Sequence, residues 1–172
     1  MKRSDEFNTL YRLHYPNVYR LCLSYVSGNS ALATELAQEV FIKVWQNRAR
    51  FREESKISTW IYRITVNTCL MHLRKIKKKQ EVLLTDHAET AEEEHEENNN
   101  RKLNMLRACM KKLDEMGKML ISLVLDEIPQ KEIAEITGMS HENVRVKVHR
   151  TKGKLFKCIT LKEQQTKERN HE

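Results

Sequence analysis

Glycine and proline are scarce in this sequence, with four and two among 172 residues, and aromatic side chains make up only 6%. Because these two residues mark turns and interrupt regular structure, their scarcity is typical of a mainly helical protein. No apolar run approaches the roughly 18 residues that a membrane-spanning helix needs. The first ten residues carry acids where a secretory signal needs an apolar core, so we expect a cytoplasmic protein without membrane insertion.

Short-spaced cysteine pairs and catalytic motifs are absent as well. The cysteines are scattered, and in a reducing compartment we expect four free thiols, at Cys22, Cys69, Cys109 and Cys158. The chain contains no phosphate-binding glycine loop, no nucleophile elbow and no HExxH zinc motif. We therefore expect no enzyme, no catalytic residues, no metal site and no cofactor.

Positive charge is in excess but unevenly distributed, and the formal net charge is +7. Residues 1–79 hold 15 Lys/Arg against 6 Asp/Glu, residues 80–100 hold none against 8, and residues 101–172 hold 16 against 10. An excess of basic residues indicates a polyanionic partner. The acidic segment 80–100 has too few apolar residues to offset the entropy lost on ordering, so we predict a flexible linker between two basic domains.

Both basic segments show helical periodicity. Apolar residues recur every three or four positions in four stretches, which are 11–29, 31–47, 58–79 and 103–113, and the chain continues apolar over 119–128 after Gly117. This spacing places them on one face of a helix, as in amphipathic helices that cover a core. Residues 58–79 are rich in β-branched side chains that would also suit a strand, but their length favours a helix. We predict an all-α fold of two small helical domains.

The segment 129–155 has the spacing of a helix-turn-helix. Gly138 would end its first helix in a left-handed conformation, and Ser140 would cap the second. Ala134 is small, which would let the two helices cross closely. A motif of this kind places its second helix in the major groove of DNA.

A helical wheel divides the second helix of this motif into two faces. The face that should meet the core comprises Val144, Val148, Thr151 and Leu155. The opposite face and its basic edges should contact DNA, through Arg145, Val146, Lys147, His149, Arg150 and Lys154. The alternative interpretation is an ordinary solvated helix face, which the preceding helix-turn-helix spacing makes the weaker of the two.

Residues 113–155 closely resemble region four of bacterial sigma factors, the module that recognises promoters. Residues 35–45 resemble the region-two helix that docks on RNA polymerase, and residues 51–75 resemble the segment that melts and reads the −10 element. The two regions, in this order and with a short linker, resemble the extracytoplasmic-function (group IV) class over about residues 5–160.

The resemblance implies a sigma factor that binds core RNA polymerase and directs promoter-specific initiation. Residues 1–79 would form the region-two-like domain, which docks on the polymerase and reads the melted −10 non-template strand. Residues 101–172 would form the region-four-like domain, which reads the duplex −35 element. Members of this class are usually held inactive by an anti-sigma factor, which the resemblance therefore adds to the expected partners.

The resemblance also implies roles for single residues of the first domain. Those that match the polymerase-binding stretch are Glu35, Gln38 and Glu39. Those that match the −10 segment are Lys43, Phe51, Trp60, Tyr62, Arg63 and Asn67. Plain structural interpretations stay open, because Phe51 and Trp60 could be buried packing and Asn67 merely exposed. Trp45 is interpreted as a core residue.

Two further alternatives concern the linker and the function. Residues 80–100 could be a plain tether, or they could thread the polymerase channel as the resemblance suggests. The competing function is a stand-alone dimeric helix-turn-helix regulator with an N-terminal helical sensor domain. Residues 43–67 combine aromatic, basic and polar side chains of the kind that bind single-stranded DNA. A sensor domain has no need of residues 58–67 beside the basic tail 74–79. That combination favours the sigma factor.

Overall fold

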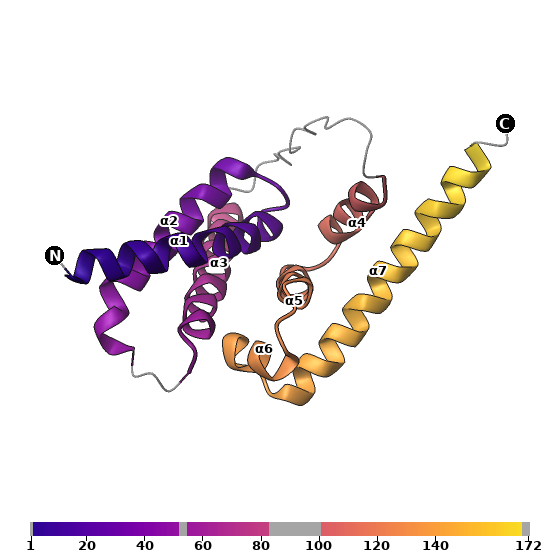
Figure 1. Cartoon of the computed structure of the whole chain (residues 1–172). Coiled ribbons are helices and arrows are strands. Elements are labelled where there is room, and N and C mark those ends of the chain that lie inside the picture. The colour runs from indigo at the N-terminus through magenta and orange to yellow at the C-terminus, as the bar shows by residue number, and fades with distance from the viewer. Residues whose placement is uncertain (1, 52–54, 83–100, 170–172) are drawn as a thin grey trace.

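The computed structural model describes residues 2–51, 55–82 and 101–169, and every regular element in these ranges is helical (Figure 1). The elements are α1 (Lys2–Tyr25), α2 (Ser30–Asn47), the short 3₁₀ helix η1 (Arg48–Arg50), α3 (Ile57–Val82), α4 (Arg101–Lys111), α5 (Glu115–Leu125), α6 (Gln130–Thr137) and α7 (His141–Arg169). The predicted all-α fold is confirmed. Most of the predicted acidic linker lies outside the described residues, although α3 continues into it as far as Val82.

Helix α1 begins earlier than the apolar pattern predicted and passes through Pro16. Proline removes one backbone hydrogen bond from a helix and often ends it. Here Pro16 is exposed, so water can reach the carbonyl group that loses its partner. The first turns are held because Phe7 and Leu10 pack against the core.

The turns between helices use the residues that the sequence indicated. Gly138 ends α6 with φ of +70°, a left-handed conformation that glycine adopts without strain. The Oγ atom of Ser140 accepts a hydrogen bond from the backbone N–H of Asn143 at 3.2 Å, which caps α7. The helix-turn-helix geometry predicted for this segment is therefore confirmed at both of its signal residues.

The main hydrophobic core is shared by the two domains. Buried side chains of α1, α2 and α3, such as Leu21, Val40 and Ile61, belong to one cluster with Leu120 of α5 and Ile133 of α6. In Figure 1, α5 and α6 lie beside the first three helices, and α7 runs along the far side. The two domains thus close against each other, an arrangement that the prediction of a flexible linker did not anticipate.

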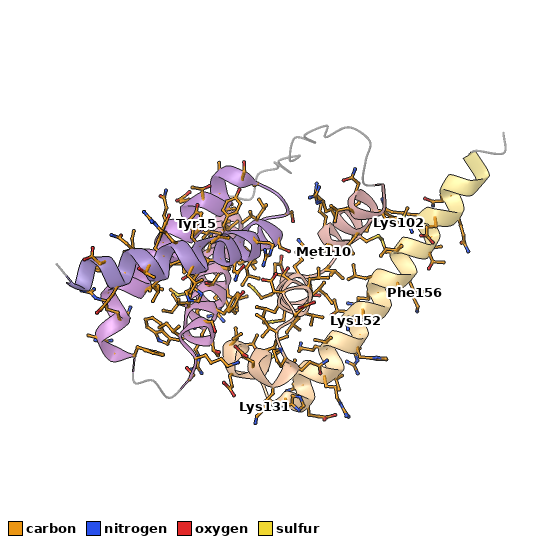
Figure 2. The ribbon with its side chains drawn as sticks, viewed as in Figure 1. Tyr15, Lys102, Met110, Lys131, Lys152 and Phe156 are labelled. Atoms are coloured by element: carbon orange, nitrogen blue, oxygen red, sulfur yellow. A yellow bond between two sulfur atoms is a disulfide. The ribbon has the colours of Figure 1, made fainter. Side chains whose placement is uncertain are left out.

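A second, smaller cluster joins α4 to α7, and it contains a disulfide bond between Cys109 and Cys158. Figure 2 shows side chains filling the space between α4, α5 and α7, with Phe156 on the outer side of α7. The prediction of four free thiols is therefore wrong for this pair. The partners are 49 residues apart, so no short motif could have revealed them. Cys22 and Cys69 are free and buried.

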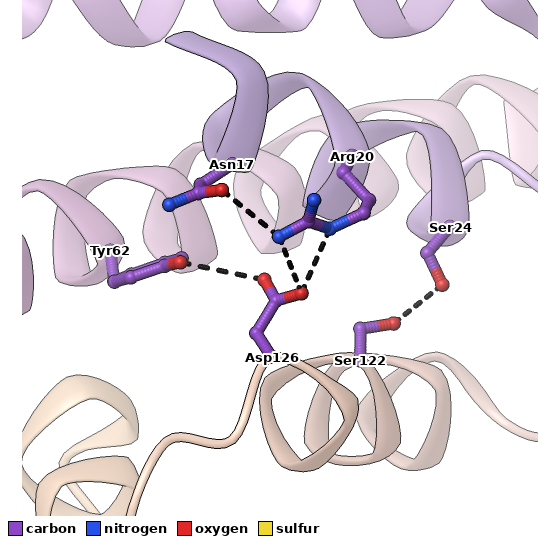
Figure 3. Close-up of polar contacts among 6 residues, drawn as sticks. All are labelled: Asn17, Arg20, Ser24, Tyr62, Ser122 and Asp126. Carbon is purple, nitrogen blue, oxygen red and sulfur yellow. Dashed lines mark hydrogen bonds and ion pairs between the residues drawn. The ribbon is translucent and has the colours of Figure 1, made fainter. Parts of the chain in front are cut away.

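Polar contacts also cross the domain interface, centred on Asp126 at the end of α5 (Figure 3). Its carboxylate accepts a hydrogen bond from Arg20 Nε at 2.8 Å and one from the Tyr62 hydroxyl at 3.4 Å. Asn17 accepts a further bond from the Arg20 guanidinium. Burial, reinforced by the charge of Asp126, raises the pKa of Tyr62 to about 12, so the phenol O–H remains a hydrogen-bond donor to this carboxylate even in mildly alkaline solution.

Replacing Asp126 with Ala should loosen the closed arrangement. The change leaves the buried Tyr62 hydroxyl without this acceptor, which typically costs about 1–3 kcal/mol. We expect a larger radius of gyration by small-angle X-ray scattering, because the apolar contacts alone hold the domains less firmly. Glu163→Ala, which removes an exposed carboxylate near the far end of α7, is the matched control. Identical scattering from both variants and the wild type would show that the Asp126 contacts do not contribute to closure.

Candidate nucleic-acid interface

The first half of α7 presents one buried and one exposed face. Its buried residues are Val144, Val148, Thr151 and Leu155, as the helical wheel predicts. The six residues predicted to contact DNA are all exposed, namely Arg145, Val146, Lys147, His149, Arg150 and Lys154. Two valines two positions apart show the division, since Val146 is 37% exposed and Val148 only 2%. Arg145 forms a surface ion pair with Glu142 at 3.0 Å.

A cavity of about 320 Å³ opens between α2, η1 and α3 in the first domain. Three of the residues predicted for the −10 strand line it, namely Lys43, Trp60 and Asn67. Asn47, Arg50 and Met71 line it as well. The cavity therefore combines two cations, an aromatic ring and two amides, the groups that bind a phosphate backbone and the edge and face of a base.

Lys43 is held in the wall of this cavity by two partners. Its ammonium group lies 2.7 Å from the Glu39 carboxylate, one turn earlier on α2, and donates to Thr68 Oγ1 of α3 at 3.1 Å. Glu39 belongs to the predicted polymerase-binding set, so this ion pair connects the two predicted sites. Glu35 and Gln38 of the same set are exposed on α2, and Glu39 is partly so.

Trp60 is only partly buried, and it contacts both another aromatic ring and the cavity. Its ring packs against Phe51, with the ring centroids 5.3 Å apart, and it also lines the cavity. Trp60 therefore packs against the main core with part of its surface and lines the cavity with another part, so the core interpretation holds in part. Phe51 itself does not line the cavity and is connected to it through Trp60.

Two other predicted residues lie away from the cavity. Tyr62 is 7% exposed, and its hydroxyl group contacts Asp126 of the second domain, so it is not accessible to DNA in this arrangement. Arg63 is exposed and lines a separate cleft of about 240 Å³ together with Thr59, Trp60 and Glu135 of α6. The cleft thus lies where the second domain meets the start of α3.

Helix α6 covers the beginning of α3. The Glu132 carboxylate of α6 accepts a hydrogen bond from Thr59 Oγ1 at 2.6 Å and lies 3.5 Å from the Lys56 ammonium group. A carboxylate of the second domain therefore occupies the basic and polar beginning of the segment predicted to meet the −10 strand. Closure of the domains makes this edge less accessible.

Trp45 was interpreted as core, and the structure corrects this. The ring is 38% exposed, lies 4.9 Å from the Phe7 ring centroid to centroid, and carries the Arg48 guanidinium 3.4 Å from its own centroid. The core stripe of α2 is formed by Val40 and Val44 instead. Trp45 lies beside that stripe, where the early turns of α1 provide a partner that the apolar pattern had not predicted.

Sequence reasoning missed Asn47 and Arg50 of the cavity wall. Asn47 ends α2, and its side-chain amide donates to the Lys43 carbonyl at 2.9 Å. Arg50 follows in η1. The signal that could have found them was their position in the chain, because Asn47 is the last residue of the helix that carries Lys43 and Arg50 follows three residues later.

Metal-binding clusters and membrane-spanning helices are absent from the part of the chain that the structure describes. No group of three or more His, Cys, Asp or Glu side chains there could hold a metal ion. None of the described helices is long and apolar enough to cross a membrane.

Comparisons with known sequences agree with one another. Residues 10–79 match the family model of sigma-70 region 2, and residues 103–155 match that of sigma-70 region 4. The chain is 31% identical to RNA polymerase sigma factor YlaC of Bacillus subtilis, over 93% of this chain and 95% of that protein. It is 28% identical to ECF RNA polymerase sigma factor SigW of the same organism, over 90% and 89% of the two chains.

Two solved structures share the fold at 18% sequence identity. One is sigma factor RpoE in complex with the anti-sigma factor NepR from Bartonella quintana, with a TM-score of 0.79 over 90% of this chain and 97% of that one. The other is CnrH in complex with the cytosolic domain of CnrY, with a TM-score of 0.67 over 92% and 90%. Identity at this level supports likeness of fold alone.

Proposed function

This chain belongs to the extracytoplasmic-function sigma factors of bacterial RNA polymerase, and we propose which of its residues recognise each promoter element. As a sigma factor it binds core RNA polymerase and directs promoter-specific initiation of transcription. The stand-alone regulator is not favoured, because a region-two match precedes the region-four match.

The cavity between α2, η1 and α3 carries the proposal for the −10 element. A base of the melted non-template strand would enter it, with its edge on the Asn67 amide and its face near Trp60. Lys43 and Arg50 would neutralise the neighbouring phosphates. Phe51 would hold the Trp60 ring in place, and Arg63 would follow the strand along α3. Tyr62 is left out of this set because Asp126 engages it.

The exposed face of α7 would enter the major groove of the −35 element. Arg150 lies near the middle of this face, where a guanidinium can bind guanine through two hydrogen bonds. Val146 would contact a thymine methyl group, and His149 would lie beside it. Arg145, Lys147 and Lys154 lie toward the edges, where basic side chains meet phosphates and fix the register without reading bases.

The proposed partners are core RNA polymerase and an anti-sigma factor, and the proposed location is the cytoplasm. The exposed side chains of Glu35 and Gln38, with Glu39, would meet the polymerase. One protein of this fold was solved with the anti-sigma factor NepR and the other with the cytosolic domain of CnrY, which supports an anti-sigma factor as a partner here. We place the protein in the cytoplasm, with its polymerase and promoter, as an initiation factor without catalytic activity of its own.

Because α6 covers the start of α3, this edge of the −10 segment would become accessible only after the domains separate, whereas the proposed reading face of α7 is exposed in the closed arrangement. The function is tested by transcription in vitro with core polymerase, this chain and genomic templates, followed by mapping of start sites. We expect initiation at promoters with common −35 and −10 sequences only when both proteins are present, and weak DNA binding by the chain alone. Tight, dimeric binding to a palindrome without polymerase would overturn the proposal in favour of the regulator.

On α7, Arg150 and the lysines should behave differently. Arg150→Ala should cost about 1–3 kcal/mol of holoenzyme binding and relax the preference at particular −35 bases. Lys147→Ala or Lys154→Ala should weaken binding about equally on all sequences and reduce the salt slope by about one phosphate contact. The measurement is titration of each holoenzyme on single-base promoter variants at several salt concentrations. The opposite assignment of effects would mean that the helix is rotated in the groove.

A further inference from the structure

All four cysteines are paired in space, although they are scattered along the sequence. Cys22 and Cys69 bring their Sγ atoms to 3.9 Å from each other within the first domain, and both remain thiols. Cys109 and Cys158 form the disulfide of the second domain. One chain thus holds a reduced pair and an oxidised pair, and the difference lies in their surroundings.

The disulfide joins the two ends of the second domain. Cys109 is on α4, and Cys158 is on α7, eight residues beyond Arg150 and past the last residue of the region-four match. Their Cα atoms are 5.8 Å apart, which a disulfide spans readily. Since α4 packs mainly on α7, this bond is the covalent connection that holds α4 in place.

The two sulfur atoms differ in access. Cys109 is 1% exposed among Leu113, Ile121 and Leu155, whereas Cys158 is only partly buried. In the reduced protein, Cys158 is therefore the thiol that a small disulfide can reach, whereas Cys109 is buried.

The Cys22–Cys69 pair has the opposite surroundings. Both residues are fully buried, and their thiols contact each other. This contact and burial raise the pKa of Cys69, so the thiol stays protonated and unreactive. The first-domain pair is therefore the natural internal control for chemistry at the second.

We propose that Cys109 and Cys158 form a reversible thiol–disulfide modification site, oxidised by a low-molecular-weight disulfide, whose state sets the stability of the DNA-reading domain. The Cys158 thiolate attacks one sulfur of the small disulfide and releases one small thiolate. Cys109 then loses its proton to solvent and attacks the Cys158 sulfur, which releases the second small thiolate. Two protein thiols are oxidised, and one small disulfide is reduced to two thiols.

Reduction should free α4 without disturbing the reading face of α7. The helix-turn-helix is held by Val144 and Val148 in the main core, away from the disulfide. We therefore expect the reduced protein to unfold at a lower temperature but to keep the same preference among −35 bases. The proposal concerns stability, so it does not depend on the residue assignments made for the −10 cavity.

The site is tested by reducing the full-length protein, exposing it to glutathione disulfide and mapping the products by mass spectrometry after alkylation of free thiols. We expect a Cys109–Cys158 cross-link that dithiothreitol reverses, with Cys22 and Cys69 alkylated only after denaturation. Cys109→Ser should accumulate glutathione on Cys158, whereas Cys158→Ser should leave Cys109 unmodified. Cross-linking of Cys22 to Cys69 instead, or a Cys158 that does not react, would refute the site.

The effect of the disulfide on stability is measured separately, as the melting temperature of the protein. The melting temperature of the wild type should fall by several degrees on reduction, and that of Cys22→Ala should fall by the same amount. The Cys109→Ser/Cys158→Ser double variant should melt near the reduced wild type with or without dithiothreitol. If reduction left the wild-type melting temperature unchanged, the bond would form without controlling stability, and that part of the proposal would fail.

Discussion

Replacing Val148 with Asp is expected to unfold the second domain, at a cost of more than about 4 kcal/mol. The side chain is 2% exposed and belongs to the core that also contains Ile133 and Val144. The change removes buried apolar surface and places an unpaired carboxylate there, and each of these effects alone costs a few kcal/mol. Loss of helical signal on heating, followed by circular dichroism, is the measurement.

A matched control lies two residues earlier. Val146 is 37% exposed on the opposite face of the same helix, so Val146→Asp should keep the fold and its melting temperature. It should nevertheless weaken promoter binding, because it adds a negative charge to the face that we assign to DNA. If Val146→Asp unfolded the domain and Val148→Asp did not, the assignment of the buried and exposed faces of α7 would be wrong.

The second large effect is expected at the polymerase-docking face. Glu39→Arg should abolish co-purification with core polymerase, because it reverses a charge in the middle of the proposed docking face, which also includes Glu35 and Gln38. The side chain of Glu39 is 45% exposed, so the substitution is accommodated without unfolding. Pull-down of core polymerase by the tagged variant measures the effect, and circular dichroism verifies that the fold is intact.

The Glu39–Lys43 ion pair makes a second variant necessary. Lys43→Ala removes the same ion pair but leaves the Glu39 carboxylate on the surface. We expect this variant to bind core polymerase normally and to lose affinity for the −10 strand. If Lys43→Ala also failed to assemble with the polymerase, the ion pair rather than the charge of Glu39 would control docking. Normal assembly of Glu39→Arg would mean that the docking helix is wrongly identified.

Local signals account for the parts of this protein that could be predicted. Gly138 and Ser140 shape the turn through their own backbone conformation and side chain, so the helix-turn-helix was evident from its residues. The buried face of α7 followed from helical geometry, as did the stripe of Val40 and Val44 on α2. Such features depend on neighbours within a few residues of one another.

The aromatic residues illustrate what helical periodicity could not decide. A tryptophan contributes the same apolar side chain to a helical pattern whether it is buried or exposed. The sequence therefore did not show that Trp45 is exposed and that Trp60 lines a cavity. Nor did it show that Tyr62 is buried against Asp126. The outcome in each case depends on a partner from a distant element, which the spacing along one helix does not specify.

By itself the sequence determined the helical class and the exposed face of α7, because these follow from local periodicity and short-range capping, and its resemblance to sigma factors indicated the two regions. Only the tertiary structure decided that α5 and α6 close on the first domain, and that Cys109 meets Cys158. Both outcomes depend on contacts between residues about 50 to 100 positions apart, such as Arg20 with Asp126. Contacts over such separations are decided by how whole helices pack, so no short stretch of sequence encodes them.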